Sequence, residues 1–174
     1  EISMATRMAN LALSPLEARL AALQTSFRAA QSLLVGVEIT TGEGDLSRTI
    51  LVRYPDRSEG QFIAVNRDAT LLESDIRSFI SRYGIEKDYV LASSGYDGIL
   101  SHSREMLAEV QSLSQRSASL AQESRQNILL AARYRQEGED RIREAESLIP
   151  KNDFARARER LETAAERIDL SLSY

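Results

Sequence analysis

Few residues of this chain could carry out common protein chemistry. It has no cysteine, no tryptophan and one histidine, His102. The lack of cysteine excludes disulfides, Cys-ligated zinc, iron–sulfur clusters and thiol nucleophiles from this sequence. His102 lies between Ser101 and Ser103, but a nucleophile–base pair also needs an orienting group and an oxyanion site. Because no G-x-S-x-G motif is present, we expect a solvated histidine and no catalytic residue.

Phosphate, metal and nucleic-acid sites are not indicated either. Residues 42–44 read Gly-Glu-Gly, an acidic hairpin turn without the third glycine of a dinucleotide loop, and no G-x-x-x-x-G-K is present. Acid pairs such as Glu73 with Asp75 lack the spacing of a calcium loop. The net charge of −4 disfavours nucleic-acid binding by bulk attraction. We therefore expect no cofactor, no metal and no nucleic-acid partner.

Arginines gather towards the C-terminal end of the chain, and acidic residues alternate with them. Such interleaving is typical of a solvent-exposed, salt-bridged face, whose electrostatic field largely cancels. Arginine is also enriched at protein interfaces, so a docking surface for an acidic peptide or partner stays open. The candidate partner-binding residues are Tyr134, Arg141, Arg156 and Arg160.

The spacing of glycines separates two helical flanks from a turn-rich centre. Seven of the eight glycines lie between residues 36 and 98, and glycine is a strong breaker of regular structure. In the first flank we expect a short helix over 2–11. A second helix should start at Ser14-Pro15, with Glu17 completing a capping box. Its apolar stripe is Leu16, Leu20, Leu23, Phe27, Ala30 and Leu34.

The centre, 35–98, changes to the period of two that is typical of strands. Alternation predicts strands over 35–39 and 50–54, a turn at 41–45, and a short strand over 61–65 after a second turn at 55–60. A capping box at Thr70 predicts a helix that Gly84 ends, and 89–93 suggests a fourth strand. Short turns make the first three strands antiparallel. The predicted order is therefore β-β-β-α-β.

From about residue 99 a long helix of about 50 residues is expected, because no breaker precedes Gly138 or Pro150. It carries a heptad seam with mainly large residues in one row and small ones in the other. The rows are Ile99, Met106, Leu113 and Leu120, and Ser103, Val110, Ser117 and Ser124. Packing against the first flank within one chain is the favoured interpretation, and self-association through an intermolecular coiled coil is the alternative.

Residues 138–174 carry a recognisable pattern. The sequence NDFARA at 152–157 lies between two helical segments, and small and large apolar residues alternate around it. The packing positions are Ala145, Leu148, Phe154, Ala157, Leu161 and Ala164. Small residues let two antiparallel helices approach, and large ones fill the gaps around them. This stretch resembles the tetratricopeptide repeat, over about the length of one repeat.

The stretch departs from that family at four positions. Asn152 stands in place of the turn glycine, Arg141 and Glu144 in place of apolar residues, and Asp169 in place of the final proline. The departures indicate a terminal or diverged repeat, and a generic Ala-rich hairpin remains the alternative. Since about three repeats are needed for stability, the resemblance implies either further repeats after residue 174 or capping by the long helix.

These observations predict a mainly helical α+β fold. We expect an antiparallel stalk of long helices (1–34 and 99–137), a small inserted α+β head (35–98), and a tetratricopeptide-like helix pair (138–174). The predicted function is a non-enzymatic scaffold or adaptor that binds a protein partner through a helical-repeat surface. The alternative is a ligand-sensing module with a pocket among Tyr54, Phe62, Phe79 and Tyr89. An enzyme of unrecognised type is a third class.

Length and composition limit the size of the core and the location that we expect for the chain. Its 174 residues and 43% hydrophobic share can form a real core. No run of about 18 apolar residues indicates a membrane span. A start at Glu1 and an end within a helical pattern suggest a segment of a longer protein. A bacterial envelope or periplasmic location is our expectation, with the cytoplasm as the alternative.

Overall fold

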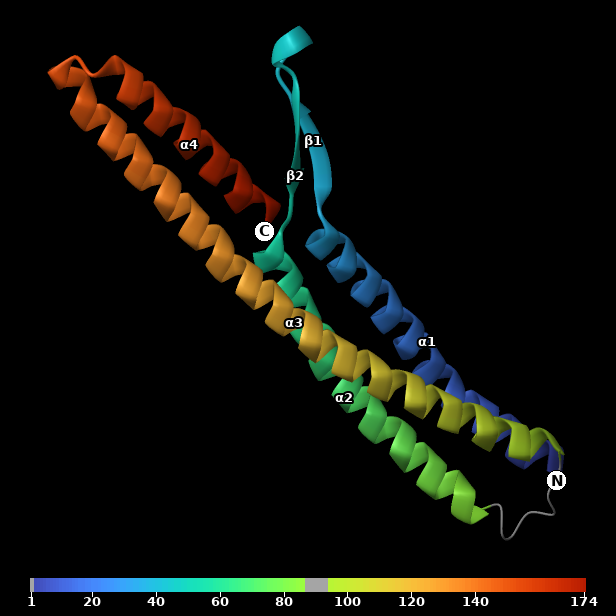
Figure 1. Cartoon of the computed structure of the whole chain (residues 1–174). Coiled ribbons are helices and arrows are strands. Elements are labelled where there is room, and N and C mark those ends of the chain that lie inside the picture. Colours follow the sequence, from blue (N-terminus) through green and yellow to red (C-terminus); the bar gives the residue numbers. More distant parts are fainter. Residues whose placement is uncertain (1, 87–93) are drawn as a thin grey trace. The chain divides into compact units, whose positions relative to one another are not determined.

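The computed structural model describes residues 2–86 and 94–174. Their elements are α1 (Ile2–Val35), β1 (Val37–Thr41), a 3-10 turn (Gly44–Leu46), β2 (Arg48–Val52), α2 (Pro55–Glu86), α3 (Ser94–Leu148), a second 3-10 turn (Ile149–Lys151) and α4 (Phe154–Ser173) (Figure 1). The fold is therefore predominantly helical α+β with a small antiparallel sheet, as predicted. The expected fourth strand over 89–93 lies outside the described residues.

The chain divides into two compact units. Unit 1 comprises the described parts of Glu1–Ala30 and Gly60–Ala121, and unit 2 comprises Gln31–Glu59 and Gln122–Tyr174. The divisions fall within α1, α2 and α3, so each of these helices contributes to both units. The predicted head, residues 35–98, is consequently distributed over the two units. Each unit is described by itself below.

Unit 1 is built from three helical segments around large apolar side chains. Four members of the stripe predicted for the first flank are buried in it, namely Leu20, Leu23, Phe27 and Ala30, whereas Leu16 is half-buried and Leu34 belongs to unit 2. Phe27 meets Phe62 of α2 edge to face, with ring centroids 5.6 Å apart. The Arg116 guanidinium of α3 lies over the Phe27 ring, 4.7 Å from its centroid. All three helices therefore meet at Phe27.

The heptad seam of α3 is buried within the chain. In unit 1, both Met106 and Val110 are buried. The Ser114 hydroxyl donates to Asn66 Oδ1 of α2 at 2.7 Å, which places α2 beside this seam. The seam is thus occupied by helices of the same chain, the favoured of the two predicted arrangements. Its buried members in unit 1 are Ile99, Ser103, Met106, Val110, Leu113 and Ser117.

The predicted turn at 55–60 and strand over 61–65 are wrong, because both segments belong to α2. Pro55 occupies the first position of the helix and Asp56 its first turn, which are favourable helix-start residues. The predicted capping box at Thr70 is also interior to α2: the Thr70 hydroxyl donates to the Asn66 carbonyl one turn earlier, at 2.9 Å. An apolar stripe with spacings of three and four runs the whole length of α2, namely Phe62, Val65, Ala69, Leu72, Ile76, Phe79 and Tyr83.

The predicted break before Ser14 is wrong as well, since α1 is continuous and contains Pro15. Proline cannot donate to the carbonyl four residues earlier, here that of Leu11. Both Pro15 and Leu11 are exposed, so water can reach that carbonyl. The helix therefore passes through Pro15 on its solvent-facing side.

The hairpin of β1 and β2 belongs to unit 2 and pairs in an antiparallel register. Val37 lies opposite Val52, and Ile39 opposite Ile50. Gly36 precedes the hairpin at φ +86°, and an added Cβ would meet the Val52 carbonyl oxygen at 2.5 Å. The predicted strands over 35–39 and 50–54 are thus confirmed in type and pairing, with their boundaries shifted.

Candidate functional site

The C-terminal helix pair of unit 2 is the region in which sequence reasoning placed a binding surface. α3 ends at Leu148 and α4 starts at Phe154, as the predicted break requires. Asn152 has a left-handed backbone, with φ 57°, which asparagine tolerates better than most residues. The Asp153 side chain accepts from the Arg156 backbone N–H at 3.3 Å and caps α4. These two residues make a sharp turn, so α4 runs back along α3 (Figure 1).

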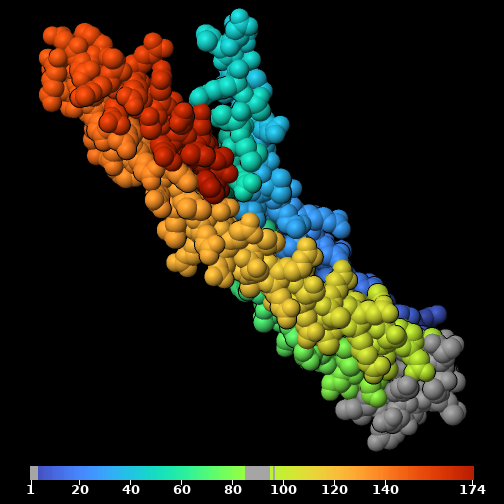
Figure 2. All heavy atoms as spheres, viewed as in Figure 1, coloured from blue at the N-terminus to red at the C-terminus, as the bar shows by residue number. Residues whose placement is uncertain are grey.

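Small residues line the contact between α3 and α4. Ala145, Ala157 and Ala164 are buried, as predicted. Gly138, expected as a breaker, lies inside α3 instead: a Cβ there would meet Ile168 Cγ1 at 2.8 Å and the Ala164 carbonyl oxygen at 3.3 Å. Its lack of a side chain therefore permits the close approach of the helices. The C-terminal part of α3 and α4 pack along each other without a visible gap (Figure 2).

The predicted role of the large residues as plugs of this pair is not what the structure has. Phe154 is 61% exposed and Leu161 is 47% exposed, and Leu148 is half-buried. The buried alanines already close the helix contact, and positions seven residues apart place Phe154 and Leu161 beside it. Exposed Ala165 follows Leu161 by four residues on the same side of α4. We call Phe154, Leu161 and Ala165 the α4 stripe.

The predicted partner-binding arginines are engaged within the pair. Glu144 accepts from Arg141 at 2.8 Å and pairs with Arg160 of α4 at 3.2 Å. Arg156 lies 3.7 Å from the carboxylate of Asp153, which caps its own helix. These ion pairs are partly exposed, and exposed pairs contribute little free energy. Their geometry corresponds to the solvent-exposed, salt-bridged face that the alternation of charges in the sequence predicts.

Tyr134 is also held by neighbours in unit 2. Its ring stacks on that of Tyr174, with centroids 5.4 Å apart and an interplanar angle of 16°. The Arg167 guanidinium lies over the Tyr134 ring at 5.7 Å and 3.5 Å from Glu137. Tyr134 therefore helps hold the C-terminal end of α4 against α3.

The hairpin contacts the C-terminal half of α4. Arg48 of β2 donates twice to the Asp169 carboxylate, at 2.6 and 2.9 Å. The Arg53 backbone N–H donates to the Leu172 carbonyl at 2.9 Å. The α4 stripe begins at Phe154, at the other end of the helix. Near its tip the hairpin stands clear of the N-terminal half of α4 (Figure 2).

A surface cavity of about 310 Å³ lies in unit 2 where β2 leads into α2. Its charged lining residues are Arg53, Asp56 and Arg135. Apolar and small side chains form the rest of the lining, namely Pro55, Ile128, Ala131, Ala132, Ser171 and Leu172. The Arg53 Nε atom is buried and has no hydrogen-bond partner among the described residues. The sequence analysis proposed none of these residues for a site, although an arginine two residues before a helix-starting proline was a usable signal.

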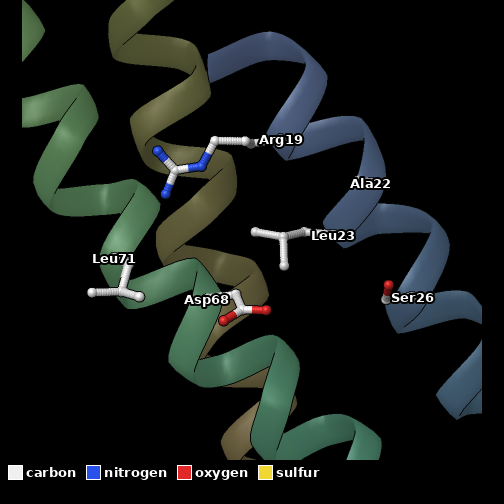
Figure 3. A pocket seen from close by; sticks show the side chains of 6 residues that line it. All are labelled: Arg19, Ala22, Leu23, Ser26, Asp68 and Leu71. Atoms are coloured by element: carbon white, nitrogen blue, oxygen red, sulfur yellow. The ribbon is translucent and has the colours of Figure 1, made fainter. Parts of the chain in front are cut away.

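A second cavity of about 320 Å³ lies in unit 1 on the α1–α2 side of the bundle (Figure 3). Arg19 and Leu23 of α1 and Asp68 and Leu71 of α2 are among the residues that line it. Arg19 donates to the Asp75 carboxylate, and Asp68 accepts from Arg67 at 3.1 Å. Both charged lining residues therefore already have partners, which disfavours a charged ligand here.

The remaining candidate sites are structural. His102 Nε2 lies 2.8 Å from Glu17 Oε1 at the unit 1 surface, with both side chains about half exposed. Phe62 and Phe79, two of the predicted pocket aromatics, are buried in the unit 1 core. Tyr54 belongs to unit 2 and Tyr89 lies outside the described residues. The described cavities are thus lined by other side chains than the predicted four.

Metal-ligand clusters and membrane-spanning helices are both absent from residues 2–86 and 94–174. No group of three or more histidines, cysteines and carboxylates is placed to hold a metal ion in these parts. None of the helices there is long and apolar enough to cross a membrane.

Comparison with known proteins returned no match: no family model fits the chain, and no curated protein and no solved structure is significantly similar to it.

Proposed function

We propose that this chain is a non-enzymatic scaffold or adaptor segment that binds an amphipathic helix of a partner protein along the α4 stripe. The observation that carries the proposal is the exposure of Phe154 and Leu161 on a helix whose inward face is closed by alanines. Residues 138–174 are, in this proposal, one diverged tetratricopeptide-like unit. Recognition by shape requires no reactive group, in keeping with the sparse chemistry of the sequence.

The chemistry of the stripe indicates what the partner presents. Burial of a Phe or Leu side chain stabilises a complex by about 1.5–3 kcal/mol at most, and aromatic anchors often dominate interfaces. Arg158 lies between Phe154 and Leu161 on the same side of α4, and it pairs at 3.0 Å with Glu162 at the border of the stripe. Because this border carries no net charge, the partner helix should offer apolar residues at i, i+3 or i+4 and i+7, with mixed charges beside them.

Site-specific crosslinking followed by affinity measurement tests the proposal. A photoreactive residue replaces Phe154 in one sample and exposed Leu129 of α3 in a matched control. A protein crosslinked from position 154 and not from 129 is identified by mass spectrometry, purified and titrated against the unmodified chain. The double variant Phe154→Ser/Leu161→Ser should then bind at least about tenfold more weakly, whereas Leu129→Ser should bind like the unmodified chain.

Circular dichroism of both variants separates loss of binding from loss of folding. Since all three substituted side chains are exposed, helical content should be unchanged. Equal affinity of the double variant and the unmodified chain for the purified partner would reject the α4 stripe as the docking surface. A partner that crosslinks equally from both positions would reject it too.

A ligand-sensing module is the second candidate function. It is favoured by one specific feature, the unit 2 cavity with Arg53 and Arg135, and not by the aromatic residues that the sequence suggested for a pocket. None of the α4 stripe residues lines that cavity.

A further inference from the structure

We propose that the cavity of unit 2 binds a small carboxylate with an apolar body. Arg53 and Arg135 would hold the carboxylate, and Ile128, Ala131 and Leu172 would contact the body of the ligand. The cavity volume of about 310 Å³ lies at the lower end of the range for small-molecule sites.

The two arginines of the cavity differ from most arginines of unit 2. Most arginines of this unit pair with a carboxylate, as Arg133 does with Glu137 at 3.0 Å. Arg53 and Arg135 form no ion pair or hydrogen bond through their side chains with any described residue. A buried guanidinium nitrogen without a partner is costly, and Arg53 Nε is such a nitrogen. An anionic ligand in the cavity would supply the missing acceptor.

The backbone adds to the positive field. Arg53 is anchored through its N–H to the Leu172 carbonyl, at 2.9 Å, so the residue is held at the cavity edge. Pro55 is the first residue of α2, whose N-terminal end carries a partial positive charge. Two arginines and a helix N-terminus therefore line a cavity whose other residues are apolar or small, apart from Asp56.

Asp56 decides which anions fit. Asp56 is a lining residue of the cavity, and its negative charge disfavours a ligand with two negative charges. A monocarboxylate carries one charge, and its planar oxygens match a guanidinium. The apolar lining then favours a ligand with a hydrocarbon body over a bare inorganic anion. An amino acid is a special case, because Asp56 would then pair with its ammonium group.

Titration of the full chain with hexanoate, followed by NMR and calorimetry, tests the proposal. Hexanoate should bind saturably, at about millimolar affinity for so small a ligand. Hexanol, which has the same body without the carboxylate, and inorganic phosphate should bind at least about tenfold more weakly. Arg53→Gln and Arg135→Gln should each weaken hexanoate binding by about tenfold. Arg133→Gln, two residues from Arg135 on α3, should leave it unchanged.

A leucine titration distinguishes the two carboxylate sources. Tighter binding of leucine than of hexanoate, lost in Asp56→Asn, would support an amino-acid ligand, whereas the reverse order would support a fatty acid. Arg135 is exposed, so Arg135→Gln keeps the test valid even where Arg53→Gln disturbs folding. Three results would overturn the proposal: no saturable binding of either carboxylate, equal hexanoate affinity in Arg135→Gln and the unmodified chain, or phosphate binding more tightly than hexanoate.

Discussion

The two units bury different kinds of side chain. In unit 1 most buried side chains are large and apolar, with Phe62, Leu72 and Ile76 fully enclosed. In unit 2 most buried residues are small or polar, and its buried apolar residues are Leu34, Ala145, Ala157 and Ala164. Ser58 and Ser124 are fully buried there, and their hydroxyl groups are hydrogen-bonded at 2.7 Å. Three helices run through both units, yet the packing chemistry changes along them.

The contrast explains where binding sites are expected. Unit 1 fills its interior with large side chains, so burial of apolar surface is its main source of stability. Unit 2 brings helices together through small residues and leaves large ones, Phe154 and Leu161, exposed. It also contains Arg53 and Arg135, which have no charged partner among the described residues. Burial of large side chains is thus concentrated in unit 1, whereas unit 2 combines small buried residues with exposed large ones.

The largest effect is expected from the unit 1 core. Phe62→Ala removes a fully buried ring that packs on Phe27, and such truncations lower the free energy of unfolding by about 3–5 kcal/mol. Urea denaturation measures the loss, and hydrogen exchange locates it. Faster exchange confined to unit 2 segments would contradict the assignment of Phe62 to the main core.

Two glycines provide a sharper comparison of packing. Gly138→Ala in unit 2 forces a methyl group against Ile168, so we expect a loss of about 1–3 kcal/mol in unfolding free energy. Gly60→Ala in unit 1 is the matched control, since nothing lies within 4 Å of its added Cβ. That variant should gain about 0.5–1 kcal/mol from helix propensity. Thermal and urea unfolding of both variants give the changes in unfolding free energy. Changes of the same sign in the two variants would disprove a tight α3–α4 contact at Gly138.

Two serines one heptad apart on α3 compare buried polar groups. Ser117 Oγ in unit 1 is buried without a partner among the described residues, whereas Ser124 Oγ in unit 2 bonds to Ser58 Oγ. Both Ser→Ala changes alter helix propensity alike, so the difference between their free energies of unfolding reports the Ser58–Ser124 hydrogen bond. We expect Ser117→Ala to be more stable than Ser124→Ala by about 1–2 kcal/mol in urea unfolding. The opposite order would show that the Ser58–Ser124 bond adds nothing to unit 2.

The smallest expected effect is a pH dependence in unit 1. Hydrogen bonds from Gln111 and Arg77 lower the pKa of the Glu73 carboxyl below its ordinary value. A lowered pKa in the folded state means that Glu73 contributes stability above its unfolded pKa and loses it as pH falls through the folded value. Stability measured by urea between pH 7 and pH 3 should therefore decline less in Glu73→Gln than in the unmodified chain. Identical pH profiles would show that these bonds do not couple to folding.

Periodicity predicted α3 and most of α1 correctly, because each of these helices buries one apolar face in unit 1. The α1 stripe through Phe27 and the α3 seam through Val110 are buried as expected. The wrong predictions lie where a strand-like pattern and a helical pattern overlap in the sequence. Residues 61–65 contain Phe62, Ile63 and Val65 and resemble a strand locally. They form part of α2 because Phe62 and Val65 continue a helical stripe whose burial outweighs local preference.

The candidate sites were less predictable than the helices. Ala145, Ala157 and Ala164 were identified as packing residues because closely packed helices require small side chains. The exposure of Phe154 and Leu161 depends on which side of α4 faces α3, and this follows from the turn at Asn152 and Asp153. The cavity joins Arg53 to Arg135 and Leu172, and no local pattern relates residues so distant in sequence.

The sequence by itself determined the helical character, the antiparallel hairpin and the break between the last two helices, because periodicity, glycine and proline act through local backbone physics. It also excluded cysteine chemistry. Only the tertiary structure decided that α2 begins at Pro55, that Gly138 is a packing position, and that two arginines line one cavity. These outcomes depend on which apolar surfaces meet and which charges remain without a partner, and both are properties of the folded chain as a whole.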